Sequence, residues 1–304
     1  MPSPPGRTRS SSVARSTRRR IPRRPPAKSQ PKSVPRCRGN PFLTRGHRPR
    51  TSPYRVEDRE AIRPFLAADP VGNAVTWDRA FQQDNYEVYA EGEPVQGVLA
   101  IQRARGPGRP NIVALHAANV EAAGALGDLL PKGFTLMHLT EEFPLAVLKP
   151  EAQEFHPLPA WLFRLDAGDF VDHLNPRVRP LAPSWASLVA GLWEPDWPAE
   201  GYVRRRIENG PSAAIYEDGS PIAWALTHMV TDRVGIIGMV HVQEGFRRKG
   251  LARSVVAAVA RELFRRDKIP ALHAYVDNIA SLSLFPTLGF RRVERQVWGD
   301  AVFR

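Results

Sequence analysis

The stretch from Val234 to Arg266 constrains the fold most, because its residue pattern changes twice. Residues 234–242, VGIIGMVHV, are a near-continuous apolar run with strand-forming residues, which is typical of a strand buried on both faces. Residues 251–266 carry apolar pairs that recur every four positions, with arginines on the other side. That spacing predicts an amphipathic helix of about four turns. The sequence therefore predicts a central strand, a short turn and a helix.

The turn between these two elements is basic and contains a glycine. It consists of Arg247, Arg248, Lys249 and Gly250. The first N–H groups of a helix have no internal partner and the macrodipole is positive there, so this position favours an anion. Glycine lets a ligand approach the backbone, and the cations add charge-assisted hydrogen bonds, which favours a phosphate or pyrophosphate. A solvated basic helix start is the alternative on these residues alone.

A second pattern follows downstream. Residues 271–276, ALHAYV, read as another strand, and DNIASLSLFPTLGF follows at 277–290. Together with the turn, this region resembles the acyl-CoA-binding half of the GNAT superfamily of N-acetyltransferases, and within it the glycine N-acyltransferase-like branch. The residues that match the family's Arg/Gln-x-x-Gly-x-Gly/Ala turn and its later Asn-x-x-Ser-x-x-Leu-Tyr-x-x-x-Gly-Phe element are 247–252, Asn278, Ser281, Leu284, Gly289 and Phe290. The resemblance covers residues 176–298 and is weaker before them.

The resemblance implies an enzyme that moves an acyl group from acetyl-CoA, or another acyl-CoA, to a primary amine by direct attack in a ternary complex. Backbone N–H groups of the central strand would grip the acyl carbonyl and the pantetheine arm, and the turn would hold the pyrophosphate. The residues that it assigns to acyl-CoA are Val240, Val242, Arg247, Arg248, Lys249, Gly250, Leu251, Ala252, Asn278, Ser281 and Phe285. The eight histidines lack ligand spacing, so no metal is expected. A non-catalytic acyl-CoA-binding protein or sensor is the alternative.

Two positions depart from the family pattern and direct attention to His241. Phe285 stands where the family usually has the tyrosine thought to protonate the leaving thiolate, and Ile236 replaces a carboxylate often found early on the central strand. His241 lies on that strand and has a side chain whose pKa suits proton uptake, so it is the predicted general base. His228 and Glu244, on the neighbouring strand and loop, are weaker candidates. Strand alternation would make His241 a packed residue instead.

The acceptor pocket is predicted from the segment before the central strand. Helices are expected at SWASLVAGLW and AEGYVRRRIEN, joined by residues 194–198. In GNAT proteins the segment between these helices commonly covers the acceptor, so the resemblance places Trp197, Tyr202 and Arg205 near it. Trp193 is as well explained as a core residue. The acceptor is expected to be a small amine or amino-acid-like molecule, and Arg204, Arg205 or Arg206 could pair with its carboxylate.

At 304 residues the chain exceeds one typical domain. We expect a disordered leader at 1–55, a half-GNAT-like domain at 56–165, a linker at 166–175 and the GNAT domain at 176–304. The predicted fold is α/β with a mixed sheet. The first domain reads as a helix, a hairpin around EGEP, a strand, a helix and a strand. It lacks the basic glycine turn, so one acyl-CoA per chain is expected.

The positive charge of the chain is concentrated at its beginning. Residues 1–50 contain 15 of the 43 basic residues and none of the 31 acidic ones, so the rest is mildly acidic. This Pro-, Ser- and Arg-rich leader has three interpretations: a basic arm for nucleic acid, an organelle transit peptide, or an overlong start. The first would make the protein nucleic-acid-associated, which is a third reading of function.

Two further features bear on where the protein works. No apolar run approaches the ~20 residues of a membrane span. Cys37 is the only cysteine, which excludes a disulfide within the chain and fits a reducing compartment. The expected location is the cytoplasm, and the sequence leaves the oligomeric state open.

Overall fold

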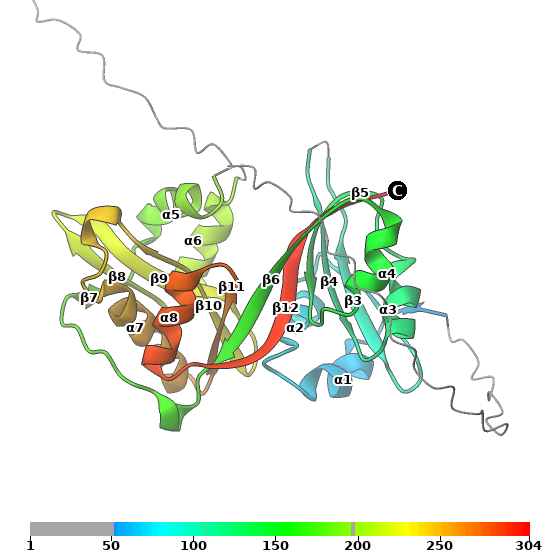
Figure 1. Ribbon diagram of the computed structural model, residues 1–304, viewed down its shortest axis with the longest axis horizontal. Coiled ribbons are helices and arrows are strands. Elements are labelled where there is room, and N and C mark those ends of the chain that lie inside the picture. Colours follow the sequence, from blue (N-terminus) through cyan, green and yellow to red (C-terminus); the bar gives the residue numbers. More distant parts are fainter. Residues whose placement is uncertain (1–51, 107, 196–197) are drawn as a thin grey trace, which may run out of the picture. The chain divides into compact units, whose positions relative to one another are not determined.

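The protein is described here by a computed structural model, which places residues 52–106, 108–195 and 198–304 (Figure 1). The leader expected at 1–55 therefore lies almost wholly outside the described residues. The strands are β1 (Tyr54–Arg55), β2 (Glu87–Glu91), β3 (Gly97–Gln102), β4 (Asn111–Ala117), β5 (Gly133–Leu139), β6 (Ala152–Arg164), β7 (Val178–Arg179), β8 (Ser212–Glu217), β9 (Ser220–Val230), β10 (Val234–Val242), β11 (Ile269–Tyr275) and β12 (Arg291–Phe303). The α-helices are α1 (Arg63–Ala67), α2 (Ala74–Phe81), α3 (Val120–Gly127), α4 (Leu145–Leu148), α5 (Ala186–Trp193), α6 (Glu200–Asn209), α7 (Leu251–Arg265) and α8 (Ile279–Leu284).

The described strands form one mixed sheet in the order β1-β2-β3-β4-β5-β12-β6-β11-β10-β9-β8-β7. The predicted α/β class with a mixed sheet is confirmed. Two parallel pairs stand out, β4 with β5 and β10 with β11, and the helices α3 and α7 form the respective crossovers. The chain thus repeats a hairpin, strand, helix and parallel strand in each half. The helices in the part of the chain that the structure describes are all too short or too polar to span a bilayer.

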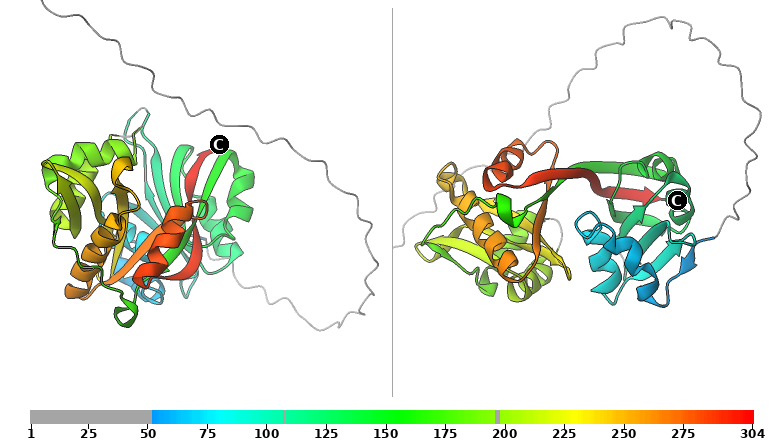
Figure 2. Two further views of the ribbon diagram at one scale, coloured as in Figure 1. Left: turned by 60° about the vertical axis from the view of Figure 1, so that its left-hand side comes forward. Right: turned by 90° about the horizontal axis from the view of Figure 1, so that it is seen from below.

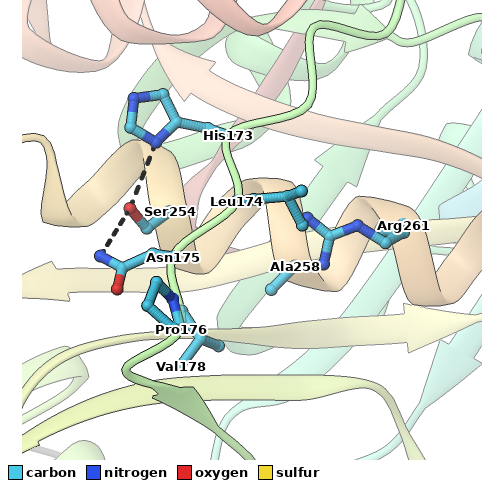
Figure 3. A pocket seen from close by; sticks show the side chains of 8 residues that line it. All are labelled: His173, Leu174, Asn175, Pro176, Val178, Ser254, Ala258 and Arg261. Carbon is cyan, nitrogen blue, oxygen red and sulfur yellow. Dashed lines mark hydrogen bonds between the residues drawn. The ribbon is translucent and has the colours of Figure 1, made fainter.

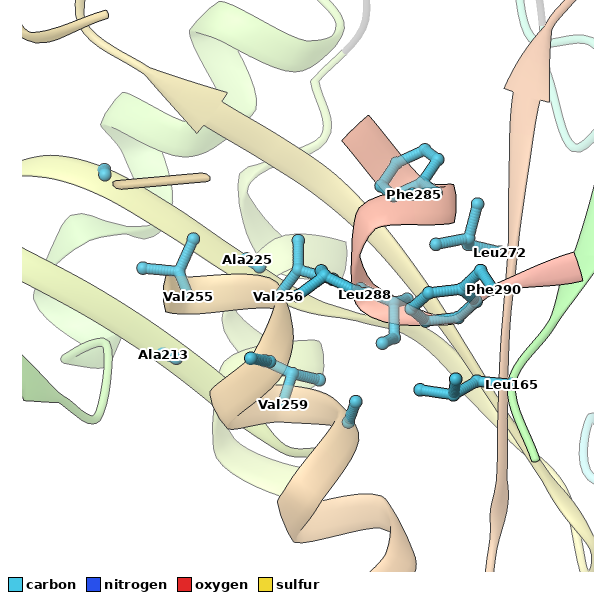
Figure 4. Packing of buried hydrophobic residues seen from close by; sticks show 14 of the residues in the cluster. Leu165, Ala213, Ala225, Val255, Val256, Val259, Leu272, Phe285, Leu288 and Phe290 are labelled. Atoms are coloured by element: carbon cyan, nitrogen blue, oxygen red, sulfur yellow. The ribbon is translucent and has the colours of Figure 1, made fainter. Parts of the chain in front are cut away.

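The second half is a three-layer arrangement because its strands alternate their side chains. Ala213, Ala223 and Ala225 face α7 and share its apolar cluster. Their neighbours Ala214 and Trp224 face the other way, against α5 and α6. The apolar pairs of α7 account for its place, since they pack against the sheet and against the segment 285–290 (Figure 4). The predicted strand-turn-helix is therefore the centre of this half.

The first half differs in detail from the prediction. The hairpin around EGEP and the strands β4 and β5 lie where expected. The helix α3 ends at Gly127 rather than continuing to Gly133, and α2 was not expected. Helix α2 packs in an apolar cluster that also contains Met229, Ile236 and Ala271 from the second half, so one core joins the two halves.

Two long strands connect the halves, and neither is a feature that the sequence pattern shows. β12 is one continuous strand rather than the several strands expected after Phe290, and it pairs with β6 along its length and with β5 from Val297 onward (Figure 2). β6 contains Pro157 and Pro159, which obscure its strand character. These prolines are tolerated because β11 pairs only with residues 160–164 of β6, so the missing N–H groups cost no bond to that strand.

Candidate functional site

The centre of the candidate site is the point where β10 and β11 separate. Their parallel pairing runs from Val234 with Ile269 to Ile237 with Leu272, and each strand continues beyond it. On its other edge, β10 is irregular: Gly238 pairs with Leu226 and His241 with Trp224, so two residues of β10 oppose one of β9. Met239, one of these two residues of β10, has a left-handed φ of +51°. Backbone groups of β10 that face β11 are thus released from the sheet after residue 237.

The turn before α7 is open and carries two left-handed residues. Arg248 has a φ of +62° and Gly250 a φ of +76°, and Gly250 is the N-cap of α7. A Cβ added to Gly250 would meet nothing closer than 3.7 Å, so backbone conformation rather than crowding requires glycine here. Arg247 donates from Nε to the Val242 carbonyl (3.2 Å), and the Lys249 ammonium lies 5.1 Å from the Phe246 ring centroid. These contacts hold the turn at the end of β10.

The remaining residues assigned to acyl-CoA lie on either side of this turn. Val240 and Val242 are half-buried against the α7 cluster, and Leu251 belongs to that cluster. Ala252 is half-buried in the first turn of the helix. Asn278 caps α8, because its Oδ1 accepts the Ser281 N–H at 3.1 Å. The assignments of all these residues to acyl-CoA stay predictions.

Phe285 lies in the core. It is 4 % exposed, and its ring meets Phe163 and Phe290 edge-on with centroids 5.8 and 6.0 Å apart. The sequence motif aligns this residue with a tyrosine that would donate a proton, whereas here the ring contributes to packing. Its contact with acyl-CoA stays a prediction.

The predicted base His241 lies flat against Trp224. The ring centroids are 4.6 Å apart with planes inclined by 20°, and the histidine keeps part of its surface. Burial, followed by the charge of Arg247, lowers the pKa of His241. The ring therefore lies on the α5 and α6 side of the sheet, as strand alternation indicates, and its catalytic role stays a prediction.

The predicted acceptor residues separate in the structure. Trp197 lies outside the described residues. Tyr202 is half-buried, stacks on Trp193 with centroids 5.7 Å apart, and has the Arg206 guanidinium 4.9 Å from its ring. Arg205 is exposed, and the guanidinium over Tyr202 comes from Arg206 instead. Helix geometry explains the difference, since residues four apart lie one above the other on the same face.

Tyr202 meets a histidine that sequence reasoning ranked second. The Tyr202 hydroxyl lies 2.9 Å from Nδ1 of His228 and 2.8 Å from the carbonyl oxygen of the same residue. A carbonyl only accepts, so the tyrosine proton points to that oxygen and Nδ1 of His228 must donate to the hydroxyl. The neutral ring then presents Nε2 as a lone pair. That atom has no hydrogen-bond partner among the described residues, yet it is not sealed from solvent.

Two more histidines share one amide nearby. Gln296 Oε1 accepts from Nε2 of His138 at 2.9 Å and from Nε2 of His273 at 2.8 Å. The amide is oriented by its own donation to the Gly72 carbonyl at 2.8 Å. Both rings therefore keep Nδ1 as a lone pair, and Nδ1 of His138 is buried without a partner. Trp298 stands between these histidines and His228, with ring centroids 4.5 to 6.0 Å away.

Electrostatics keep this cluster neutral. Burial lowers the pKa of His138 and His228 well below the ordinary value, and it lowers the pKa of His273 to about 4. Arg79 and Arg206 add to the effect at His228. Burial raises the pKa of Tyr202, so its hydroxyl stays protonated. No single sequence motif contains this cluster, because its members come from β5, β9, β11, β12 and α6.

A separate pocket of about 280 Å³ lies along α7 (Figure 3). The segment 173–178 forms one wall, and Ser254, Ala258 and Arg261 form the other. Ser254 Oγ accepts from Asn175 Nδ2 at 3.2 Å. None of the residues that line this pocket belongs to β10 or β11. Among the described residues, no three His, Cys, Asp or Glu side chains come together as a metal site would need.

Comparisons with known proteins agree on the fold. The family model for FR47-like protein matches residues 206–299. A Drosophila protein of known structure has a TM-score of 0.64 at 15% identity, over 83% of this chain and 98% of its own. A putative GNAT-family acetyltransferase from Novosphingobium aromaticivorans has a TM-score of 0.54 at 19% identity, over 79% and 99%.

A tandem GNAT protein from the clavulanic acid biosynthesis pathway has a TM-score of 0.52 at 14% identity, over 83% of this chain and 97% of its own. No curated protein matches the sequence significantly. The chain therefore has a GNAT fold that extends over both halves. The glycine N-acyltransferase-like branch stays a prediction.

Proposed function

We propose that this protein is an acyl-CoA-dependent N-acyltransferase with its active site where β10 and β11 diverge. One observation carries the proposal: the strands separate after Ile237, and β10 leads directly into the open, basic turn that begins α7. A released strand edge can hold a carbonyl and an amide-rich arm, and the helix start can hold a pyrophosphate. The two features lie at the two ends of one short segment, which suits one long ligand.

The residues fit acyl-CoA in three respects. The turn is open above Gly250, and three cations flank it at Arg247, Arg248 and Lys249. Asn278 Oδ1 accepts a hydrogen bond in the cap of α8, so its amide Nδ2 is the group that can donate to a ligand at the end of β11. Val240 and Val242 lie two residues apart on the released stretch, so their N–H groups would face the same edge. These are the residues that would hold the cofactor.

The first half shows why one site per chain is expected. There, β4 and β5 pair as far as Leu115 with Leu139, and the Thr140 N–H extends the contact to the Leu115 carbonyl at 3.0 Å. The start of α3 is capped by the side chain of Asn119, which accepts from Ala122 N–H at 2.8 Å. This half thus has neither a separation of strands nor an open helix start at the equivalent place. We assign it a supporting role beside the acceptor.

The chemistry is transfer of an acyl group to an amine nitrogen. The thioester supplies an acyl group on a thiol leaving group. The chain has to hold the carbonyl, bring a neutral nitrogen against it and accept one proton. Phe285 cannot donate a proton to the leaving thiolate. A thiol with a pKa near ~8.5 can leave unprotonated at neutral pH at a cost of only about 1 to 2 kcal/mol, because its pKa lies roughly one unit above that pH. The proton on the amine is therefore the more demanding one.

The test is an acceptor screen with the full chain. Acetyl-CoA is incubated with a panel of amines, and free thiol is measured alongside binding of CoA by calorimetry. We expect CoA to bind once per chain and thiol to appear only when an amine is present. A protein that binds CoA but releases no thiol with any amine is a non-catalytic binding protein. A protein that binds no CoA lacks the proposed function altogether.

A further inference from the structure

We propose that His228, oriented by Tyr202, takes the proton from the acceptor, and that the acceptor is a weakly basic, aromatic nitrogen nucleophile that is uncharged at neutral pH. This inference rests on the proposed N-acyltransferase function and names its base and its substrate class. It is carried by the position of His228, by the direction of its lone pair and by the charges and rings around it.

His228 lies directly over the point where the strands separate. A Cβ added to Gly238, the first residue of β10 beyond the pairing, would lie 3.2 Å from the Cβ of His228 and 3.9 Å from its Cγ. His228 is itself an extra residue in β9, because Met229 pairs with Ile236 and Thr227 with Ile237. The glycine therefore makes room for the imidazole, and the irregular pairing turns it toward the separation. His273 is the first residue of β11 after Leu272, the last residue that β11 pairs with β10.

The hydrogen bonds of Tyr202 fix the orientation of the lone pair at His228 Nε2. Tyr202 donates to the carbonyl of His228 and accepts from Nδ1, which fixes both the tautomer and the ring plane. Rotation of the ring would break that second bond. His273 keeps Nδ1 as a further acceptor, because Gln296 holds its Nε2–H. Two histidines, each with one acceptor nitrogen, thus lie beside the separation of the strands.

The surroundings disfavour a cationic acceptor. Among the described residues, the charged groups that act on His228 are the guanidiniums of Arg79 and Arg206, and its titratable neighbours are His138, His273 and Tyr202. Arg79 is paired with Asp78 at 3.0 Å, whereas Arg206 forms no ion pair within the described residues. An ammonium here would meet like charge, and the carboxylate of Asp78, which among the described residues acts on Tyr202, is already bound to Arg79 through Oδ2. A neutral nitrogen can instead donate its hydrogens to the imidazole lone pairs.

The side chains around His228 are aromatic. The ring centroid of Trp298 lies 6.0 Å from that of His228. The ring centroid of Trp193 lies 5.6 Å from that of His228, with the two ring planes inclined by 67°. A ligand with a flat aromatic ring packs well against aromatic side chains. An arylamine or arylhydrazine meets both requirements, since its nitrogen is uncharged at neutral pH and its body is flat.

The proton balance of the step is complete. The nitrogen lone pair forms the new C–N bond as the C–S bond breaks and its electrons leave on sulfur. One proton passes from the nitrogen to Nε2 of His228, and from there to the thiolate or to water. A base with a lowered pKa suits this task, because a nitrogen nucleophile becomes strongly acidic only as the C–N bond forms. Such a base would be a poor partner for an ammonium that must first lose its proton.

The decisive measurement compares matched acceptors. Aniline and benzylamine differ by one CH₂, as do 4-aminobenzoate and 4-(aminomethyl)benzoate, but only the benzylic members are ammonium ions at pH 7. With the full chain and acetyl-CoA, we expect kcat/KM to favour the arylamine in at least one pair by tenfold or more, and to be flat between pH 6.5 and 8. Preference for the benzylic member of both pairs, or acetylation of other amines but no arylamine, overturns the substrate class and leaves the proposed function standing.

The role of the two residues is tested with variants. His228→Ala is expected to lower kcat/KM for the arylamine by ~10² while the affinity for CoA is unchanged. His228→Gln, which keeps an acceptor but cannot take up a proton, is expected to lose as much and covers the case in which the alanine variant does not fold. Full activity in the glutamine variant would overturn the assignment of His228.

Tyr202 is a positioning residue, and its test includes a measurement other than activity. In ¹⁵N-histidine-labelled protein, the His228 signals should show a protonated Nδ1 and a pyridine-like Nε2. Tyr202→Phe should lose that preference and lower kcat more than it raises KM. An Nε2-protonated His228 in the wild type would overturn the orientation, whatever the enzyme acylates.

Discussion

His138 Nε2 lies 2.9 Å from Gln296 Oε1, joining β5 to β12 across 158 residues of sequence. The same oxygen accepts from His273 on β11, and the amide nitrogen donates to the Gly72 carbonyl and to Glu294. One buried side chain thus satisfies two histidines and a backbone carbonyl. The arrangement also fixes the histidine tautomers next to the proposed active site.

Replacing Gln296 by leucine should cost much of the stability of the protein. It leaves two N–H donors and a carbonyl buried without partners, at about 1 to 3 kcal/mol each, so we expect a total loss of roughly 3 to 9 kcal/mol. The measurement is urea denaturation. Gln243→Leu is the matched control, because Gln243 is half-buried and donates to one carbonyl, that of Pro221. Equal losses in the two variants would show that the cluster is not a stabilising network.

Gly250→Glu should abolish CoA binding while the protein stays folded. The change places a carboxylate at the helix start where the pyrophosphate would bind, so the two anions compete for one position. It also forces a side chain to adopt a φ of +76°. Gly124→Glu is the control, since Gly124 lies on α3 with open space around it and receives the same charge. Calorimetry with CoA gives the result. Unchanged affinity in a folded Gly250→Glu protein would remove the cofactor from this turn.

Alanine variants separate the two candidate bases. His241 stacks on Trp224 and has no oriented hydrogen bond comparable to that of His228. We therefore expect His241→Ala to lower kcat less than tenfold, against the ~10² expected for His228→Ala. The rates are compared at pH 7 with saturating acetyl-CoA. A loss of ~10² confined to His241→Ala would support the base that the sequence pattern predicts.

Phe285→Tyr should change turnover less than tenfold and should reduce stability. The ring is enclosed by Phe163 and Phe290, so the added hydroxyl would be buried in an apolar cluster, at a cost of about 1 to 3 kcal/mol. Phe246→Tyr, at a half-buried site, is the control and should be near neutral. Stability is measured in urea and turnover by thiol release. A large gain in turnover would mean that the hydroxyl reaches the thiolate after all.

Stability should fall as the pH falls from about 6.5 toward 4. His273 has a pKa of about 4 in the folded protein because it is buried, against an ordinary value near 6.5 when unfolded. In that window the unfolded chain binds a proton that the folded protein does not, so acid favours unfolding by up to about 3 kcal/mol from this residue. His138 and His228 act in the same direction. Above pH 6.5 this dependence should vanish.

The measurement is the free energy of unfolding in urea at several pH values. His273→Gln keeps a donor for Gln296 and should flatten the acid dependence by about the same amount, 3 kcal/mol. An unchanged slope in that variant would mean that His273 titrates normally.

The sequence by itself determined the elements whose causes are local. The apolar run of β10, the four-residue periodicity of α7 and the glycine between them predict the strand, the helix and the turn, because each depends on residues within a few positions. The same is true of the hairpins. The motif also singled out Asn278, which in the structure caps α8.

Tertiary structure alone decided what lies around that segment. β12 could have ended as an edge strand of the second half, but it pairs with β5 of the first half. This pairing depends on the core that the two halves share and not on the residues of β12 alone. The neutral histidines, their shared amide and the Tyr202 contact come from strands far apart in the sequence, and burial rather than residue type lowers their pKa values. No periodicity encodes such a cluster, because burial and charge at one residue depend on which distant segments fold against it.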